Sequence, residues 1–204
     1  MKPTRRTYPK GLPWLALAVA LLARDAAAAE LGERVLRAEV VVNGPIGEVW
    51  RSWTTSDGAR TFFAPDAWIE PRVDGAYELY FRPEAPAGLR GSEGMRILAF
   101  EPEKRLAYTW NAPPEIPEIR GQRTQVIVEL EALGAARTRV RLTHLGWGHG
   151  EAWDRAYAYF DRAWGAIVLP RLVARFASGP IDWSAPPAPS EGPSLATTLV
   201  PRAD

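Results

Sequence analysis

The chain has 204 residues, enough for one domain with a substantial core, and its 47% hydrophobic and 24% charged residues are typical of globular proteins. The net charge of +1 hides an asymmetry, because five of the 25 basic residues but one of the 24 acidic residues lie within residues 1–28. The remaining 20 basic and 23 acidic residues make a weakly acidic body, which argues against a nucleic-acid partner. The absence of cysteine excludes disulfides, thiolate catalysis and cysteine metal sites.

Residues 1–29 have the pattern of an export signal peptide. A basic start is followed by an apolar run from Leu12 to Ala23 and by small residues, Ala26 to Ala29, that suit cleavage. We therefore expect a periplasmic or secreted protein with no stable membrane insertion after the signal is removed. The Arg5-Arg6 pair also resembles a twin-arginine signal, so the export route stays open, as does an uncleaved anchor.

The first predicted elements are one strand and two short helices. Leu36–Val42 is a β-branched run typical of a strand, and Asn43-Gly44-Pro45 ends it. Apolar residues at helical spacing predict a helix over 45–54, with the proline in its first turn. Thr55 can cap a second helix that runs to about Phe63.

Six further strands follow, because the apolar pattern changes to a period of two. Gly, Pro and Asn clusters separate the runs, which predicts an antiparallel meander. The strands are expected around Trp68-Ile69, Tyr77–Phe81, Gly94–Phe100, Leu106–Trp110, Val126–Leu130 and Val140–Leu142. Glu78 and Glu129 alternate with apolar positions and are expected to face solvent.

One long amphipathic helix is predicted over Glu151–Gly179, and the rest of the chain is organised around it. Gly179-Pro180 is a stop signal, and Pro170 removes the hydrogen bond to the Ala166 carbonyl, which predicts a kink. Its apolar stripe is unusually aromatic: Trp153, Tyr157, Phe160, Trp164, Ile167 and Val168.

The order β-α-α-β6-α predicts an α+β helix-grip fold, a curved antiparallel sheet wrapped around the C-terminal helix. Such folds usually keep a cavity between helix and sheet. We expect the domain to span residues 35–179 and residues 184–204, which are rich in proline, to form a disordered tail.

Several motifs, in this order, resemble the SRPBCC or START-like superfamily. Pro45–Trp50, the Phe62-Phe63 helix end, Trp68 and the turn Asp74–Tyr77 are similar to the start of such proteins. Four segments are similar to the branch named after the activator of the heat-shock-protein-90 ATPase: Gly94–Pro102, Lys104–Trp110, Thr138–Gly146 and Trp164-Gly165. The resemblance implies the helix-grip fold but not one activity, since the superfamily includes transfer proteins, cyclases, receptors and co-chaperones. Export would separate the chain from a cytosolic ATPase partner.

No catalytic or cofactor motif is recognisable in the sequence. A nucleophile elbow, a phosphate loop and a dinucleotide fingerprint are all absent, and His144 and His149 lack metal-ligand spacing. We therefore expect no cofactor and no metal. His144 is the better candidate for a ligand or acid–base contact, because a strand end beside the helix would form a cavity mouth. The candidate ligand-binding residues are Trp68, Tyr80, Trp110, His144, Trp153, Tyr157, Phe160 and Trp164.

The sequence favours an exported protein that binds or carries a small hydrophobic molecule, such as a lipid, in a helix-grip cavity without covalent catalysis. A cyclase or dehydratase that uses the same cavity, with His144 or an inward carboxylate as its acid–base group, is one alternative. A co-chaperone-like protein-interaction module is the other. Ligand identity and oligomeric state stay open.

Overall fold

A computed structural model describes residues 33–190 and 197–200. The proposed signal peptide, residues 1–29, lies outside the described residues. The element order confirms the predicted β-α-α-β6-α arrangement. The elements are β1 (Glu33–Val42), α2 (Ile46–Thr54), α3 (Ser56–Arg60), β2 (Asp66–Ile69), β3 (Tyr77–Tyr80), β4 (Ile97–Glu101), β5 (Arg105–Trp110), a 3-10 turn (Pro117–Ile119), β6 (Thr124–Ala132), β7 (Thr138–Leu145), α4 (Glu151–Arg162), a π-helical segment (Ala163–Val168), α5 (Leu169–Ser178) and β8 (Thr197–Val200).

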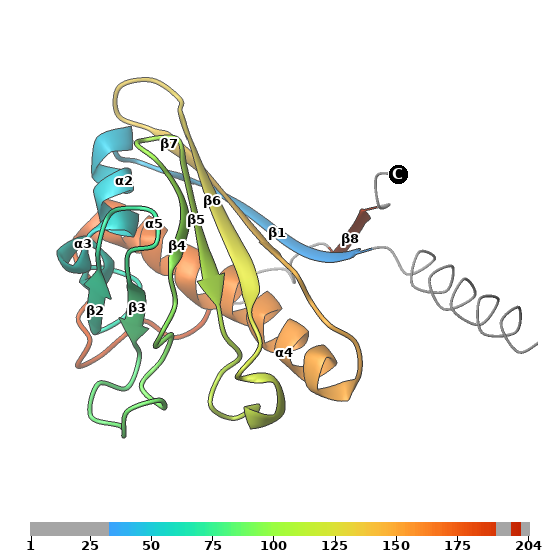
Figure 1. Cartoon of the computed structure of the whole chain (residues 1–204). Helices are drawn as coiled ribbons and strands as arrows, with labels where there is room; N and C mark the ends of the chain where they lie inside the picture. Colours follow the sequence, from blue (N-terminus) through green and yellow to red (C-terminus); the bar gives the residue numbers. More distant parts are fainter. Residues whose placement is uncertain (1–32, 191–196, 201–204) are drawn as a thin grey trace, which may run out of the picture. The chain divides into compact units, whose positions relative to one another are not determined.

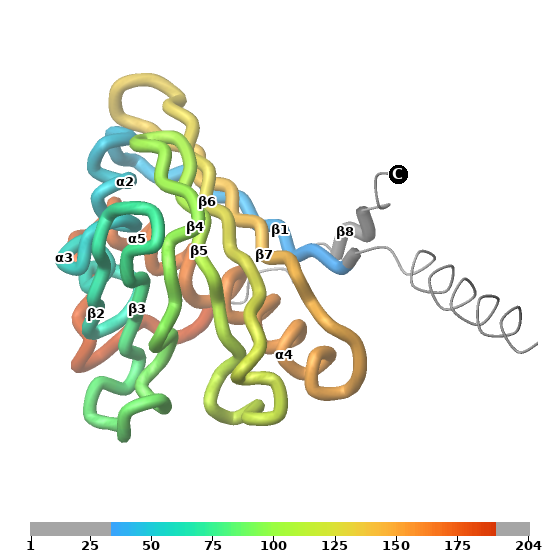
Figure 2. The backbone as a smooth tube through the Cα atoms, in the orientation of Figure 1, coloured from blue at the N-terminus to red at the C-terminus, as the bar shows by residue number. Residues whose placement is uncertain are grey.

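The larger sheet has the strand order β4-β5-β6-β7-β1-β8, and its strands from β4 to β1 pair antiparallel (Figure 1). Strands β2 and β3 form a separate two-stranded sheet. Two isolated bridges, Ala76 with Arg96 and Tyr80 with Gly91, join this hairpin to the chain that precedes β4 (Figure 2). β8 lies within the range for which the sequence predicts a disordered tail, and residues 191–196 and 201–204 of that range lie outside the described residues.

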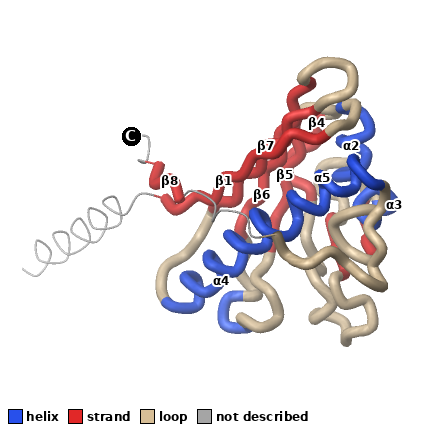
Figure 3. Tube along the Cα trace, turned by 180° about the vertical axis from the view of Figure 1, so that it is seen from behind, coloured by secondary structure: helices blue, strands red, loops and turns tan. Residues whose placement is uncertain are grey.

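The sheet has one apolar and one charged face, as the period-two pattern requires. Inward-facing side chains of β5, β6 and β7 are buried: Leu106, Tyr108, Trp110, Val126, Val128, Leu130, Val140, Leu142 and His144. On the outer face Arg139 and Arg141 each pair with both Glu39 and Glu131. The C-terminal helix lies against the strands of the larger sheet, as Figure 3 shows from behind.

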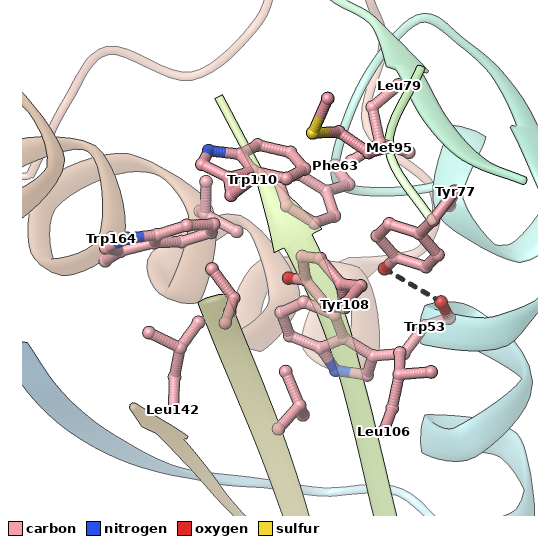
Figure 4. Packing of buried hydrophobic residues seen from close by; sticks show 14 of the residues in the cluster. Trp53, Phe63, Tyr77, Leu79, Met95, Leu106, Tyr108, Trp110, Leu142 and Trp164 are labelled. Atoms are coloured by element: carbon pink, nitrogen blue, oxygen red, sulfur yellow. Dashed lines mark hydrogen bonds between the residues drawn. The ribbon is translucent and has the colours of Figure 1, made fainter. Parts of the chain in front are cut away.

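The two short helices close one end of the core. Pro45 occupies the N-cap of α2, and Thr55 caps α3 by accepting a hydrogen bond from the Gly58 N–H at 3.0 Å. α2 buries Trp53, whose backbone carbonyl accepts a hydrogen bond from the Tyr77 hydroxyl at 3.0 Å (Figure 4). This bond fixes the hairpin to the helical end of the domain.

The long C-terminal helix occupies the predicted range but changes its winding in the middle. α-Helical turns give way to a π-helical segment over Ala163–Val168, directly before the turn that contains Pro170. The Ala166 carbonyl, which Pro170 leaves without its helical donor, accepts hydrogen bonds from Ser190, at 2.8 Å from the backbone N and 3.3 Å from Oγ. The C-terminal segment thus supplies the hydrogen bond that the proline removes.

Candidate functional site

A cleft of about 390 Å³ lies between the π-helical segment and the loops that follow β3 and β5. Its floor is aromatic and consists of four buried side chains from four parts of the chain. They are Phe63 after α3, Trp110 at the end of β5, Phe160 of α4 and Trp164 of the π-helical segment. A cleft of this size with an apolar lining is typical of small-molecule sites.

The floor rings pack in a continuous stack. Phe63 lies nearly parallel to Trp110 with ring centroids 6.0 Å apart, and Trp164 meets Phe63 edge-on at 5.8 Å (Figure 4). Phe160 in turn stacks on Trp164 at 6.1 Å. These contacts fix the orientation of each ring, so the floor is formed before any ligand arrives.

The mouth of the cleft is also apolar, although it is open to solvent. Phe81 and Leu89 come from the segment after β3, and Tyr159 comes from α4 on the other side. Their exposed fractions are 41%, 45% and 49%, which places three of the large exposed hydrophobic residues of the described chain around one opening. Exposed apolar side chains gathered around a cleft indicate a binding surface, because a bound molecule removes their apolar area from water.

The π-helical segment gives the cleft one wall. Four of its six residues, Ala163, Trp164, Ile167 and Val168, line the cleft, and Arg171 follows in α5. π-Helical turns are rare and often occur at functional sites, where the wider turn changes which side chains face one direction. The wall therefore depends on the irregular winding that precedes Pro170.

His144 lies behind the floor and not at the cleft mouth that the sequence suggests. The Trp164 indole N–H donates to its Nδ1 at 3.0 Å, and its Nε2 lies 2.7 Å from Thr124 Oγ1. Because an indole only donates, Nδ1 is the acceptor and the neutral ring carries its proton on Nε2. Burial lowers the pKa of His144 well below its usual value, so the ring is neutral at pH 7 and holds Trp164 in place.

The structure brings three of the eight candidate residues together in the cleft: Trp110, Phe160 and Trp164. Trp153 and Tyr157 pack instead around Trp147, beyond His144. The Tyr80 hydroxyl donates to Glu78 at 2.7 Å, and Trp68 is 50% exposed on β2; neither residue lines the cleft.

Glu78 corrects one expectation from the sequence. The alternation predicts that it faces solvent, but the side chain is buried. Its carboxylate accepts hydrogen bonds from the Tyr80 hydroxyl and from the Gly94 N–H at 2.9 Å, and these bonds compensate for the burial. Glu129 is exposed, as predicted. Paired in this way, the Glu78 carboxylate serves the hairpin rather than the cleft.

The residues at the mouth of the cleft cannot be recognised from the sequence alone. No sequence pattern assigns a role to Phe81, to Tyr159 or to the loop segment Gly88–Gly91, although Phe81, Tyr159, Leu89, Arg90 and Gly91 line the cleft. The available signal was the concentration of arginine and proline residues in the loops after β3 and β5. Only the fold shows that those loops meet at one place.

The described residues offer neither a metal centre nor a membrane-spanning helix. No group of three or more His, Asp or Glu side chains there is arranged to hold a metal ion. None of the helices within the described ranges combines the length and apolarity needed to cross a membrane.

An antiparallel sheet wrapped on a long C-terminal helix, with a cleft between helix and loops, places this protein in the helix-grip class. Its residues 43–177 match the model of the family described as "Activator of Hsp90 ATPase homolog 1-like protein", and the chain belongs to that family. A search of curated proteins found no match.

Solved structures with the same fold have low sequence identity to this chain. A protein of Mesorhizobium loti is 22% identical, with a TM-score of 0.53 over 70% of this chain and 93% of the other. The Aha1 dimer from Colwellia psychrerythraea is 18% identical, with a TM-score of 0.51 over 71% of this chain and 97% of the other. An HSP90 activator from Plasmodium falciparum is 13% identical, with a TM-score of 0.54 over 72% and 97% of the two chains. These likenesses establish the fold and leave the function to be argued from the cleft.

Proposed function

We propose that this protein binds or carries a small, largely hydrophobic molecule in the cleft between its C-terminal helix and the loops after β3 and β5. One observation carries the proposal: a cleft of about 390 Å³ has a preformed aromatic floor and a mouth of solvent-exposed apolar side chains. Covering Phe81, Leu89 and Tyr159 with an apolar ligand removes their surface from water, which stabilises the complex by about 25 cal/mol for each Å² buried. The family and its fold support a ligand-binding or related domain in general.

Tyr159 gives the sharpest test, because it stands at the mouth and is half exposed. N-phenylnaphthylamine is a neutral probe that fluoresces in apolar surroundings and is titrated into the full chain. Tyr159→Ala is expected to weaken probe binding about tenfold through lost aromatic contact, while the free energy of unfolding falls by about 0.5–1.5 kcal/mol, because the Tyr159 ring meets Phe160 edge-on at 5.0 Å.

Trp68→Ala is the matched control, because Trp68 is equally exposed and lies outside the cleft. It should leave probe binding unchanged. Equal losses from Tyr159→Ala and Trp68→Ala, or no binding to the unaltered chain, would refute the proposal.

Catalysis by His144, the leading acid–base candidate, receives less support from this geometry. A general acid or base must reach the reacting group, and His144 is fully buried behind Trp164 with both ring nitrogens in hydrogen bonds. Glu115 is the one carboxylate among the described lining residues, and it pairs with Arg82 at 2.9 Å. A binding role uses the aromatic floor directly, whereas the cyclase or dehydratase alternative requires a proton-transfer group in the cleft.

We also propose that the protein acts outside the cytoplasm, on the basis of the basic, apolar and alanine-rich pattern of residues 1–29. The intact mass of protein expressed in its own host tests this. A mature chain that begins near Ala29 or Glu30 is expected, and a full-length cytosolic species would refute export.

A further inference from the structure

The charged side chains around the cleft are mostly positive. Four arginines and one glutamate line it: Arg82, Arg90, Arg120, Arg171 and Glu115. Two of the arginines are already compensated by carboxylates. Arg82 pairs with Glu115 at 2.9 Å, and Arg90 pairs with Glu93 at 2.8 Å. The other two account for the excess positive charge.

Arg120 is held by backbone carbonyl groups. Its guanidinium donates to the carbonyls of Gly88 and Gly91, both at 2.7 Å from Nη2, and to that of Ala112 from Nη1. These bonds tie together the two loops that form the cleft wall. It forms no ion pair within the described residues, although Glu93 and Glu115 act on its charge from a greater distance, and burial lowers its pKa. Arg120 therefore contributes a fixed positive field.

The Arg171 guanidinium is positioned by a ring contact but has no acceptor among the described residues. Its guanidinium carbon lies 5.2 Å from the centroid of Trp183, and the Trp183 indole is itself anchored to the Arg60 carbonyl at 2.6 Å. No hydrogen bond or ion pair joins the Arg171 side chain to another of the described residues, and its Nε is buried without a partner. A buried donor without an acceptor costs free energy, so a ligand oxygen that reaches Arg171 gains more than it would in water.

We propose that the cleft selects amphipathic anions, in which an aromatic or alkyl body lies on the aromatic floor and a carboxylate-like group binds Arg171. This inference rests on the proposed function and names the ligand class for the same site. The planar guanidinium presents paired donors that match a carboxylate, and such charge-assisted bonds are the strong ones. The field of Arg120 favours the same sign of charge.

Arg175 provides a matched control on the same helix. It lies one turn beyond Arg171, its guanidinium carbon is 5.1 Å from the Phe176 centroid, and its Nε is also buried without a partner. Unlike Arg171 it does not line the cleft. Substitution of each arginine by methionine removes the same charge and keeps an unbranched stem, so only the place in the fold differs.

The test compares two probes that share one apolar body. N-phenylnaphthylamine is neutral, and anilinonaphthalene sulfonate carries the same rings with one anionic group, so both are titrated into the full chain by fluorescence. At low salt the sulfonate is expected to bind about tenfold more tightly or better, and added salt should narrow the difference. Arg171→Met should abolish this preference while neutral-probe binding is kept, and Arg175→Met should retain it. Decanoate should displace the bound sulfonate at lower concentrations than decanol does.

Each contrary outcome is distinguishable. If the neutral probe binds and the sulfonate binds no better, anion selection is wrong while the proposed function stands. If neither probe binds, both fail. Equal loss of the preference in Arg171→Met and Arg175→Met would assign it to net charge and overturn the site. Thermal unfolding checks that Arg171→Met folds. If it does not fold, Arg171→Lys replaces it, and the loss of the planar guanidinium should reduce the preference for the sulfonate. An unchanged preference in Arg171→Lys would contradict the role of the Arg171 guanidinium.

Discussion

The first turns of the C-terminal helix and its π-helical middle carry the same aromatic stripe but use it differently. In α4, Tyr157 packs on Trp147 with ring centroids 5.0 Å apart, and Arg34 covers the Tyr157 ring at 5.0 Å. In the π-helical segment the stripe continues through Trp164, where it forms the floor of an open cleft.

The difference follows from the loops that face each region. The short segment after β7 brings Trp147 directly onto α4, so the aromatic rings there are covered by the chain itself. The longer loops after β3 and β5 meet each other through Arg120 and leave space above the π-helical segment. A continuous apolar stripe on one helix can thus support packing at one end and a binding site further along.

The largest expected effect is that of Trp164→Ala. This side chain is 1% exposed, so its removal should cost about 3–5 kcal/mol of the free energy of unfolding, and it also takes the donor from His144 Nδ1. Chemical denaturation measures the loss, and N-phenylnaphthylamine binding should weaken with it. Trp153→Ala, in the covered region, should also destabilise the protein but leave probe binding unchanged. Unchanged probe binding in Trp164→Ala would show that this part of the helix only fills the core and does not line a binding site.

A smaller effect is expected from pH, through His144. The folded-state pKa lies well below that of the unfolded chain, about 6.5, so the unfolded state binds more protons as the pH falls. The contribution of neutral His144 to the free energy of unfolding should be fully present above pH 6.5. As the pH falls below 6.5, the free energy of unfolding should decrease by up to about 1.4 kcal/mol per pH unit until the pKa of His144 in the folded protein is reached.

Denaturation at pH 7 and pH 5 measures this dependence. His144→Gln should remove the His144 contribution between these two values, and His149→Gln, at an exposed position, should leave it in place. The same pH dependence in His144→Gln and in the unaltered protein would show that other groups cause it.

The smallest expected effect comes from the C-terminal segment. Ser190→Pro removes the N–H that donates to the Ala166 carbonyl, an exposed contact worth about 1 kcal/mol, so the melting temperature should fall by about 2–4 °C.

Deletion of residues 184–204 should lower the melting temperature little more than Ser190→Pro does, because a proline-rich segment buries little apolar surface. A drop of more than roughly 8 °C on deletion would show that the tail is a docked part of the domain.

The fold was predictable from local patterns. The change from a period of two to a helical period, the proline at the start of the first helix, the cap at Thr55 and the stop at Gly179 together define the element order. The helix stripe identifies two floor residues, Phe160 and Trp164, and the alternating pattern of the facing strand identifies a third, Trp110. Each of these signals is a property of neighbouring residues in the chain.

The mouth and rim of the site were not predictable, because they depend on contacts between distant segments. Leu89 and Tyr159 are 70 positions apart and line one opening only after the sheet has curved over the helix. His144 illustrates the opposite failure, since its place at a strand end suggested a cavity mouth, but both ring nitrogens are used to hold the floor. A sequence pattern predicts which face of a helix or strand is apolar, but not which other segment packs against that face.

A crystal structure of the full chain with N-phenylnaphthylamine bound would show whether the cleft is the binding site. The naphthyl ring is expected within the cleft, over Trp110 and between Phe81 and Tyr159. A probe seated on the exposed Trp68 surface, or a cleft that stays empty at saturating probe, would contradict it.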